Sequence, residues 1–242
     1  MNLQDILQYR RSVRHYDSQK TIDADRVKEC IRLATLAPTS SNMQLWEAYH
    51  VVNPQKLKLL GQACLEQKAA TSAPQMVVFV VRPDLVKRHA EAVLSFERGN
   101  VEHNSPEEKQ SKRIKRLESY YRKLIPFLYG RCFGLLGSLR KILVQVIGLS
   151  KPVPRQVSEG DMRTVMHKSC ALAAQTFMLA MAETGYDTCP MEGFDSLRVK
   201  RILGLPRAAQ INMIVSCGIR TPEGIWGERF RIPFEETYRR VD

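Results

Sequence analysis

Three arginines and a serine lie close together near the start of the chain, in the stretch Arg10-Arg11-Ser12-Val13-Arg14. A guanidinium group is permanently charged and offers a planar fork of N–H donors that matches a phosphate group, and a serine hydroxyl adds a further donor. Charge clusters also occur as solvated faces with no ligand. The residue types and spacing make this stretch a candidate phosphate site, with a solvent-exposed charge run as the alternative.

Three further stretches suit ligand binding. Residues 37–44, APTSSNMQ, form a loop of small donors and acceptors, which is either an ordinary turn or a hydrogen-bonding cradle for a polar ring or sugar chain. Residues 189–194, CPMEGF, include Gly193, which allows a ligand to approach the backbone, unless this is a plain loop before a helix. Residues 229–231, RFR, carry two arginines at alternate positions, with solvent exposure as the alternative.

The elements that must position these residues follow from hydrophobic periodicity. Helices are expected at residues 3–9, 23–36, 55–68, 107–124, 135–147, 161–184 and 196–203. Strands are expected at residues 46–52, 76–81, 186–190 and 211–219. The run MVVFVV at 76–81 is apolar throughout, which predicts a central strand buried on both faces. Strands mixed with a larger share of helix predict an α+β or α/β fold with one central sheet.

Two long segments need separate comment. The helix at 161–184 is rich in small and apolar residues on most sides, which predicts the buried centre of a domain or of a dimer, and Gly185 suits its C-cap. Residues 97–108 are polar and are expected to form a loop, and residues 150–157 a proline-punctuated connector. Residues 223–242 show no clear period and are expected to form an arm that lies on a surface.

Composition sets limits on function. The chain of 242 residues is 44% hydrophobic and 26% charged, which is typical of a globular protein with a real core. Neither a secretory signal nor a membrane span of about 20 apolar residues is expected. The six scattered cysteines include no CxxC pair, which argues against a zinc site or disulfides and favours the cytoplasm. The five histidines are unclustered, so neither a metal site nor a catalytic triad is expected.

The net charge of +12 is unevenly distributed. Residues 109–141 contain ten Lys or Arg against Glu118, which gives this segment +9 and leaves +3 for the remainder. The chain is therefore nearly neutral with one basic segment. No nucleic-acid-binding motif accompanies the charge, so no nucleic-acid partner is expected.

Taken together, the motifs resemble those of the FMN-dependent nitroreductases. The resemblance rests on RRSVR, APTSSNMQLW, PMEGFD, LGLP before a strand that ends in GIR, and RFRIP, in that order. It covers roughly residues 1–83 and 161–240 and leaves out the basic middle. Each motif is weak by itself, but five in the family's order and spacing make chance agreement improbable.

The resemblance implies a nitroreductase-like α/β sandwich, in which helices flank a central mixed, mainly antiparallel sheet, and an intertwined homodimer with FMN at the subunit interface. It implies that the FMN phosphate, ribityl chain and pyrimidine edge are held by Arg10, Arg11, Ser12 and Arg14, with Arg229 and Arg231 completing the phosphate site. The partner subunit would contribute Pro38, Thr39, Ser40, Ser41, Asn42 and Gln44. Pro190 and Met191 would also contact the cofactor, and the backbone N–H groups around Glu192 and Gly193 would face flavin N5 and O4.

The activity that the resemblance implies is hydride transfer from NADPH or NADH to flavin N5, followed by electron transfer to a nitroaromatic, a quinone or another small electron-poor acceptor, with ping-pong kinetics. The hard chemistry belongs to the cofactor, so no catalytic side chain is assigned. The alternative is a flavin-binding module associated with a membrane or a redox protein and reduced by ferredoxin or flavodoxin.

Residues 97–160 form a longer and more basic insert than a minimal nitroreductase has, within an expected single domain of residues 1–242. Three interpretations stay open. The insert is a helical cap whose apolar stripe packs on the domain or the partner subunit; or a lid whose basic residues attract an anionic substrate or the NADPH phosphate; or a surface that meets anionic lipid or an acidic electron donor.

Overall fold

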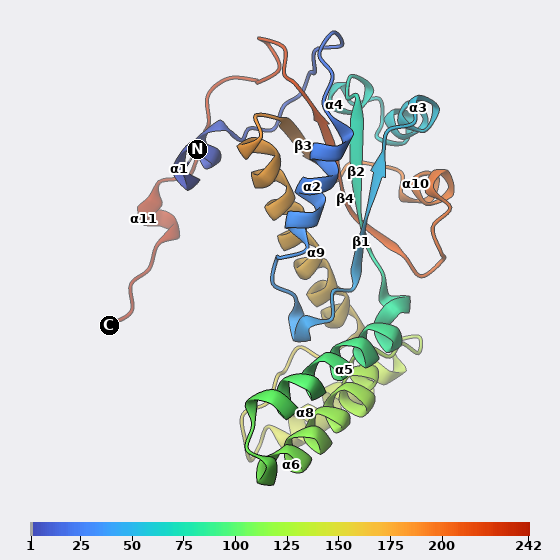
Figure 1. Cartoon of the computed structure of the whole chain (residues 1–242), viewed down its shortest axis with the longest axis vertical. Helices are drawn as coiled ribbons and strands as arrows, with labels where there is room; N and C mark the ends of the chain where they lie inside the picture. The colour runs from blue at the N-terminus through green and yellow to red at the C-terminus, as the bar shows by residue number, and fades with distance from the viewer. Residues whose placement is uncertain (1) are drawn as a thin grey trace.

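The centre of the fold is a four-stranded sheet in the order β1-β2-β4-β3 (Figure 1). Every neighbouring pair of these strands is antiparallel, and the sheet gains one parallel bridge where Ser12 lies beside Thr188 at the β3 edge. The fully buried β2 is a central strand, as its unbroken apolar run predicts. The strands are β1 (Trp46–Val51), β2 (Gln75–Val81), β3 (Asp187–Met191) and β4 (Gln210–Gly218). The computed structural model describes residues 2–242.

Helices cover both faces of this sheet, which gives the predicted α/β sandwich. On one face, the long helix α9 (Glu159–Glu183) packs with α2 (Ala24–Ala34) against alternate side chains of β2, including Phe79. The other face of β2 meets α3 (Pro54–Ala63), α4 (Lys68–Thr71) and α10 (Ser196–Leu203). Because α9 contacts every strand, it is the core helix that its small, apolar sequence predicts.

Residues between β2 and α9 form a group of helices at the lower end of Figure 1. They are η2 (Pro83–Leu85), α5 (Val86–Asn104), α6 (Glu107–Ser119), the π-helical η3 (Tyr120–Leu124), α7 (Ile125–Tyr129) and α8 (Leu135–Ile147). The loop expected at 97–108 is wrong, because α5 continues to Asn104 and only Ser105 and Pro106 separate it from α6. The helical spacing of apolar residues in α5 continues to Val101 among polar neighbours, and Pro106 ends the helix.

The N-terminal helix and the terminal arm lie on the same side of the molecule, away from the α5–α8 group (Figure 1). The short helix α1 (Leu3–Tyr9) begins at a capping box formed by Asn2 and Asp5. The terminal arm starts near α1 and contains α11 (Phe234–Thr237). The arm was expected to lie on a surface, but beyond Arg229 it is exposed and projects from its own chain.

Two smaller differences concern helix continuity. The helix expected at 55–68 divides into α3 and α4, because Leu65 and Glu66 adopt left-handed backbone conformations with φ of 60° and 54°. The loop expected at residues 37–44 contains a short 3-10 turn, η1 (Ser40–Asn42). None of the helices within residues 2–242 combines the length and apolarity that crossing a bilayer requires.

Candidate functional site

The segment that follows α1 runs beside the edge strand β3. The backbone N–H of Val13 donates to the Thr188 carbonyl at 3.1 Å, and Val13 itself is fully buried. Alternation along this extended segment turns Ser12 and Arg14 away from the core, where both remain partly exposed. The sheet edge therefore holds the RRSVR stretch in an extended form with its polar side chains outward.

These polar side chains line a cavity of about 300 Å³ together with the start of the terminal arm. Ser12, Ile225, Trp226 and Phe230 contribute to its wall, and Glu228 is its acidic member. The cavity brings together all the arginines of the two predicted motifs, from opposite ends of the sequence: Arg10, Arg11, Arg14, Arg229 and Arg231. Two motifs separated by more than 200 residues thus form one electropositive site, as an anion site requires.

Glu228 offsets only part of the positive charge of this cavity. Within residues 2–242, none of its five arginines forms an ion pair with a carboxylate. Burial lowers the pKa of Arg10, and the neighbouring charges of Arg229, Arg231 and Arg11 lower it further. Clustering like charges in a half-buried place is unfavourable, so a polyanion bound here would relieve the repulsion.

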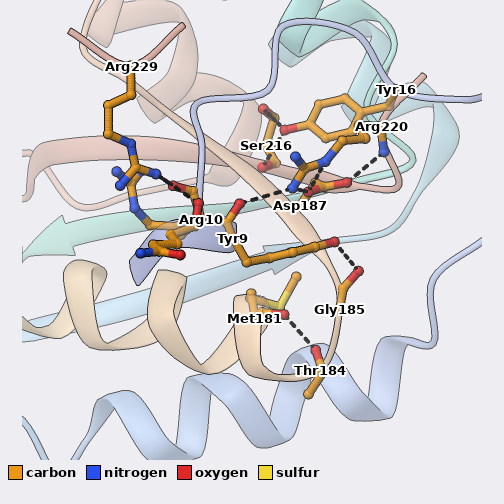
Figure 2. A network of polar contacts seen from close by, with 11 residues as sticks. Tyr9, Arg10, Tyr16, Met181, Thr184, Gly185, Asp187, Ser216, Arg220 and Arg229 are labelled. Carbon is orange, nitrogen blue, oxygen red and sulfur yellow. Dashed lines mark hydrogen bonds and ion pairs between the residues drawn. The ribbon is translucent and has the colours of Figure 1, made fainter. Parts of the chain in front are cut away.

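Arg229 holds the end of α1 in place. Its guanidinium donates to the carbonyls of Leu7 at 2.8 Å and Gln8 at 3.0 Å. It also donates to the Arg10 carbonyl at 2.6 Å (Figure 2). A helix leaves its last carbonyls without partners, and a cation there also offsets the helix dipole. Arg229 therefore joins the arm to α1 and fixes the backbone of Arg10, which motif reasoning did not predict.

Two other cavity arginines contact the start of the arm. Arg11 donates to the Gly227 carbonyl at 2.9 Å, and the Arg14 guanidinium lies 5.8 Å from the centre of the Trp226 ring. Trp226 is a lining residue that the motif analysis missed, because a single exposed tryptophan in an aperiodic segment carries no spacing signal. These contacts align the RRSVR segment and the arm while leaving N–H groups of Arg10 and Arg14 available.

A buried ion pair anchors this whole corner. Arg220 donates from its backbone N–H and from Nε to the Asp187 carboxylate, each at 2.7 Å, and the Asp187 side chain is 1% exposed. The Arg220 guanidinium also stacks 4.5 Å from the centre of the Tyr9 ring, and the Tyr9 hydroxyl donates to the Gly185 carbonyl at 2.8 Å (Figure 2). The pair therefore ties α1 to the C-terminal end of α9 and to β3.

Replacing Arg220 by alanine is expected to lower the free energy of unfolding by about 3 kcal/mol, because it leaves the buried Asp187 carboxylate without its cation. Urea denaturation followed by circular dichroism measures the loss. Arg198→Ala, which removes an exposed ion pair with Asp195, serves as the control and should change stability by less than about 1 kcal/mol. Equal effects of the two substitutions would contradict the structural role of Arg220.

The end of β3 reaches the same corner. Burial raises the pKa of the Cys189 thiol, while the charges of Arg14 and Arg10 act in the opposite direction, which places both arginines near this strand. Beyond it, Met191 is buried and Glu192 and Gly193 are exposed. The Gln67 side chain donates to the Gly193 carbonyl at 2.7 Å and so fixes the turn. Pro190 and Met191 thus end the strand that supports RRSVR, and Glu192 and Gly193 follow it directly.

The loop of residues 38–44 lies elsewhere. The Ser40 backbone N–H donates to the Ser169 hydroxyl on α9 at 3.2 Å, whereas Tyr9 contacts Gly185 just beyond the other end of that helix. Sixteen residues separate Ser169 from Gly185, which corresponds to about 24 Å along α9 at the usual helical rise. Within one chain, the arginine cluster and this loop therefore lie too far apart to hold the same small group directly.

The loop of residues 38–44 nevertheless has a well-defined conformation. Ser41, Asn42 and Gln44 adopt left-handed backbone angles with φ of 53°, 53° and 48°, and the Gln44 amide donates to the Asn42 side-chain oxygen at 3.0 Å. Pro38, Ser40, Asn42 and Gln44 are exposed, and Thr39 and Ser41 are half-buried. Non-glycine residues with positive φ persist where the surroundings determine them, and they cluster at functional sites.

The loop also borders a second cavity and the helical insert. Gln44 and Trp46 line a hollow of about 480 Å³, and Trp46 Nε1 is buried without a hydrogen-bond partner among residues 2–242. The Tyr120 hydroxyl lies 2.7 Å from the Ser41 hydroxyl. Trp46 is the last residue of the APTSSNMQLW motif but has no predicted role there, and Tyr120 carries no motif signal.

The described part of the chain offers no set of side chains arranged to bind a metal ion. No group of three or more His, Cys, Asp or Glu side chains is arranged to hold a metal ion within residues 2–242. The best-defined candidate site is therefore the arginine-lined cavity beside β3.

Comparison with known proteins assigns the chain to one family. The family model described as "Nitroreductase family" matches residues 7–219. The chain belongs to the nitroreductase family. Among its relatives, Protein DrgA of Synechocystis sp. is 25% identical over 235 residues, covering 96% of this chain and 91% of that protein.

Two further nitroreductase relatives are informative. YdgI of Bacillus subtilis, named as a candidate NAD(P)H nitroreductase, is 26% identical over 237 residues, covering 96% of this chain and 93% of that protein. A nitroreductase-like structure from Exiguobacterium sibiricum, solved in complex with FMN, superposes with a TM-score of 0.68 at 17% identity and covers 100% of this chain and 98% of its own. The nitroreductase-like fold predicted from the motifs is therefore confirmed.

Proposed function

We propose that this nitroreductase-family protein is an FMN-dependent oxidoreductase that passes electrons from NADPH or NADH to a nitroaromatic, a quinone or another small electron-poor acceptor. The observation that carries the proposal is the convergence of five arginines without an ion-pair partner among the described residues, from both ends of the chain, on one cavity beside β3. This donor set fits the doubly charged phosphate of FMN, because guanidinium groups bind phosphate through paired hydrogen bonds. The FMN-bound relative and the name of YdgI support the same cofactor and donor class.

Most of the predicted cofactor residues have a specific role in this proposal, and Pro190 and Met191 would position the turn that contacts the flavin. Arg10, Arg11, Ser12, Arg14 and Arg231 would hold the phosphate and ribityl chain, and Arg229 would align Arg10 by holding the end of α1. Backbone N–H groups at Glu192 and Gly193 would contact the flavin edge, in a turn held by Gln67. When bound, FMN would supply hydride transfer at its N5 atom. The chain's contribution is to bind, orient and polarise the cofactor, so no catalytic side chain is required.

The loop of residues 38–44 is assigned to the partner subunit of a homodimer. Within one chain this loop is about 24 Å along α9 from the arginine cluster, so a second copy must bring its loop to the cavity if both hold one FMN. The arm projecting from its own chain and the exposed Leu172 on α9 supply surface for such a partner. Pro38, Thr39, Ser40, Ser41, Asn42 and Gln44 would then complete each site across the interface.

Donor and acceptor are proposed to use the same open face of the flavin in turn, which predicts ping-pong kinetics. Tyr120 and Tyr121 both contact Ser41, so the insert borders the loop that would line this face. The basic residues of the insert would then attract an anionic substrate or the NADPH phosphate. The free thiols, five of them buried, support the cytoplasm as the site of action.

The test is anaerobic reduction of the purified protein. We expect a flavin absorption spectrum that bleaches rapidly on addition of NADPH or NADH and recovers on addition of a quinone or nitroaromatic. Initial rates at varied donor and acceptor concentrations should give the parallel double-reciprocal lines of a ping-pong mechanism. Bound flavin that resists both nucleotides would contradict the proposed donor and favour a protein donor such as ferredoxin or flavodoxin. A protein that cannot be loaded with FMN would contradict the whole proposal.

A further inference from the structure

Helix α8 presents an apolar face to solvent. On the inward side of this helix Arg140 is buried and Leu136, Val144 and Ile147 are half-buried, whereas the remaining apolar side chains of α8 are exposed. The exposed fractions are 70% for Leu135, 54% for Leu139, 65% for Ile142, 45% for Leu143 and 62% for Val146. The apolar stripe of α8 therefore does not pack on its own chain. This excludes the form of the cap interpretation in which the stripe packs on its own domain. Contiguous exposed apolar side chains mark a surface for a protein or a membrane.

The orientation of this face is fixed by a buried arginine. Arg140 is 1% exposed and donates to carbonyls on both sides of it: Nε to Val157 at 2.7 Å, and Nη1 to Phe127 at 2.6 Å and Leu128 at 2.8 Å. These bonds pin the inward side of α8 against the end of α7 and the start of α9. The opposite, apolar side of α8 is therefore held toward solvent by these contacts. Its exposure does not come from a loosely attached helix.

The turn before α8 extends the same face. Phe133 is fully exposed and has a φ of 46°, an unusual angle for a bulky residue. The Glu159 carboxylate accepts from the backbone N–H groups of Cys132 at 2.9 Å and Gly134 at 3.1 Å, and so holds the turn on both sides of Phe133. An aromatic ring is therefore presented at the N-terminal end of the apolar face, and the exposed Leu149 continues it at the other end.

The charge around this face has one sign. No Asp or Glu occurs between residues 119 and 158, and that interval contains seven Lys or Arg residues. Arg131 precedes the apolar face and Lys151 follows it; both are exposed, and neither forms an ion pair with a described carboxylate. The two nearest acids on α9 are already used, because Glu159 holds the turn and Asp161 forms the capping box of α9 with Ser158.

We propose that α8 and the Phe133 turn form a docking surface for an anionic membrane. An apolar helix face edged by Lys and Arg binds in the interface of a bilayer, with its apolar side chains among the acyl chains and its cations at the headgroups. A second copy of the chain fits less well, since antiparallel pairing of two such faces places Arg131 against Lys151 of the copy, and like charges oppose association. An acidic protein fits less well too, because leucine and valine are under-represented among protein–protein hot spots.

The proposal does not depend on the flavin, and its test uses the full chain. Co-sedimentation would compare vesicles of pure phosphatidylcholine with vesicles that contain about one third phosphatidylserine. The variant Ile142→Gln with Val146→Gln removes two apolar side chains from the centre of the face. The control Leu59→Gln with Leu197→Gln removes two exposed leucines from α3 and α10, on the other face of the sheet.

Binding to the anionic vesicles is expected for the wild type and for the control, and at least about tenfold weaker binding for the α8 variant. All three proteins should keep equal flavin content, which separates this test from that of the cofactor. Absence of wild-type binding, or equal binding by the α8 variant, would overturn the proposal. So would a smaller oligomer for the α8 variant in sedimentation velocity without lipid, since that result would mean that a second copy covers the face.

Discussion

Replacing Arg10 and Arg231 together by alanine is expected to weaken FMN binding about a thousandfold, because each removes a charge-assisted contact worth roughly 1.5–3 kcal/mol. These two arginines come from opposite ends of the chain and line the same cavity. The fold should survive the change. Arg231 is exposed, and the Arg10 carbonyl, which accepts from Arg229, is kept in an alanine variant.

Fluorescence titration of the FMN-free protein with FMN gives the dissociation constant, and circular dichroism reports the fold. The control is Arg239→Ala with Arg240→Ala, which removes the same charge from the same arm outside the cavity. A general electrostatic effect would weaken binding equally in both variants. Unchanged affinity in the cavity variant would contradict the phosphate assignment.

Much of the fold could be predicted from periodicity. The run at 76–81 has no polar residue, and in the structure every side chain of β2 is buried between two layers of helices. The small, apolar helix at 161–184 is the core helix α9, and Gly185 ends it with a φ of 80°, which glycine adopts without strain. Such positions are determined locally, so the sequence pattern is sufficient.

The insert was harder to predict because its helices are largely exposed. Residues 97–104 are helical although their composition is polar, since tertiary packing of α5 needs only one narrow apolar edge. The apolar stripe of α8 predicted a helix correctly but not what covers it. Which side faces inward depends on Arg140, whose carbonyl partners come from residues 10 to 17 positions away.

The candidate site shows the same limit. The arginine motifs predicted a shared anion site, and one cavity does contain all five side chains. The contacts of Arg229 with the end of α1 and of Trp226 with Arg14 depend on how the two chain ends meet, which no local pattern encodes. The separation of the loop at 38–44 from that cavity likewise follows only from the length of α9.

That separation leads to the second large prediction. Asn42→Gly with Gln44→Gly removes two exposed polar side chains while keeping the left-handed backbone that both residues adopt. Loss of two neutral hydrogen bonds should weaken FMN binding roughly tenfold or more. Because this loop lies about 24 Å along α9 from the arginine cluster of its own chain, the lesion should act on the site of the partner subunit.

Intersubunit complementation measures this directly. A chain with Arg10→Ala and Arg231→Ala and a chain with Asn42→Gly and Gln44→Gly carry different purification tags and are co-expressed. The doubly tagged heterodimer is isolated and equilibrated at an FMN concentration at which neither parent homodimer retains flavin. One of its two interface sites then combines the intact arginine cluster with the intact loop, and the other combines both lesions.

The decisive quantity is the flavin content of that heterodimer. A flavin site shared between two subunits predicts recovery of about half of the wild-type content, because one of two symmetric sites is restored. The recovered half should also be reduced by the nucleotide that reduces the wild type. A heterodimer as empty as its two parents would contradict the shared site, since it would mean that each chain builds its flavin site from its own residues.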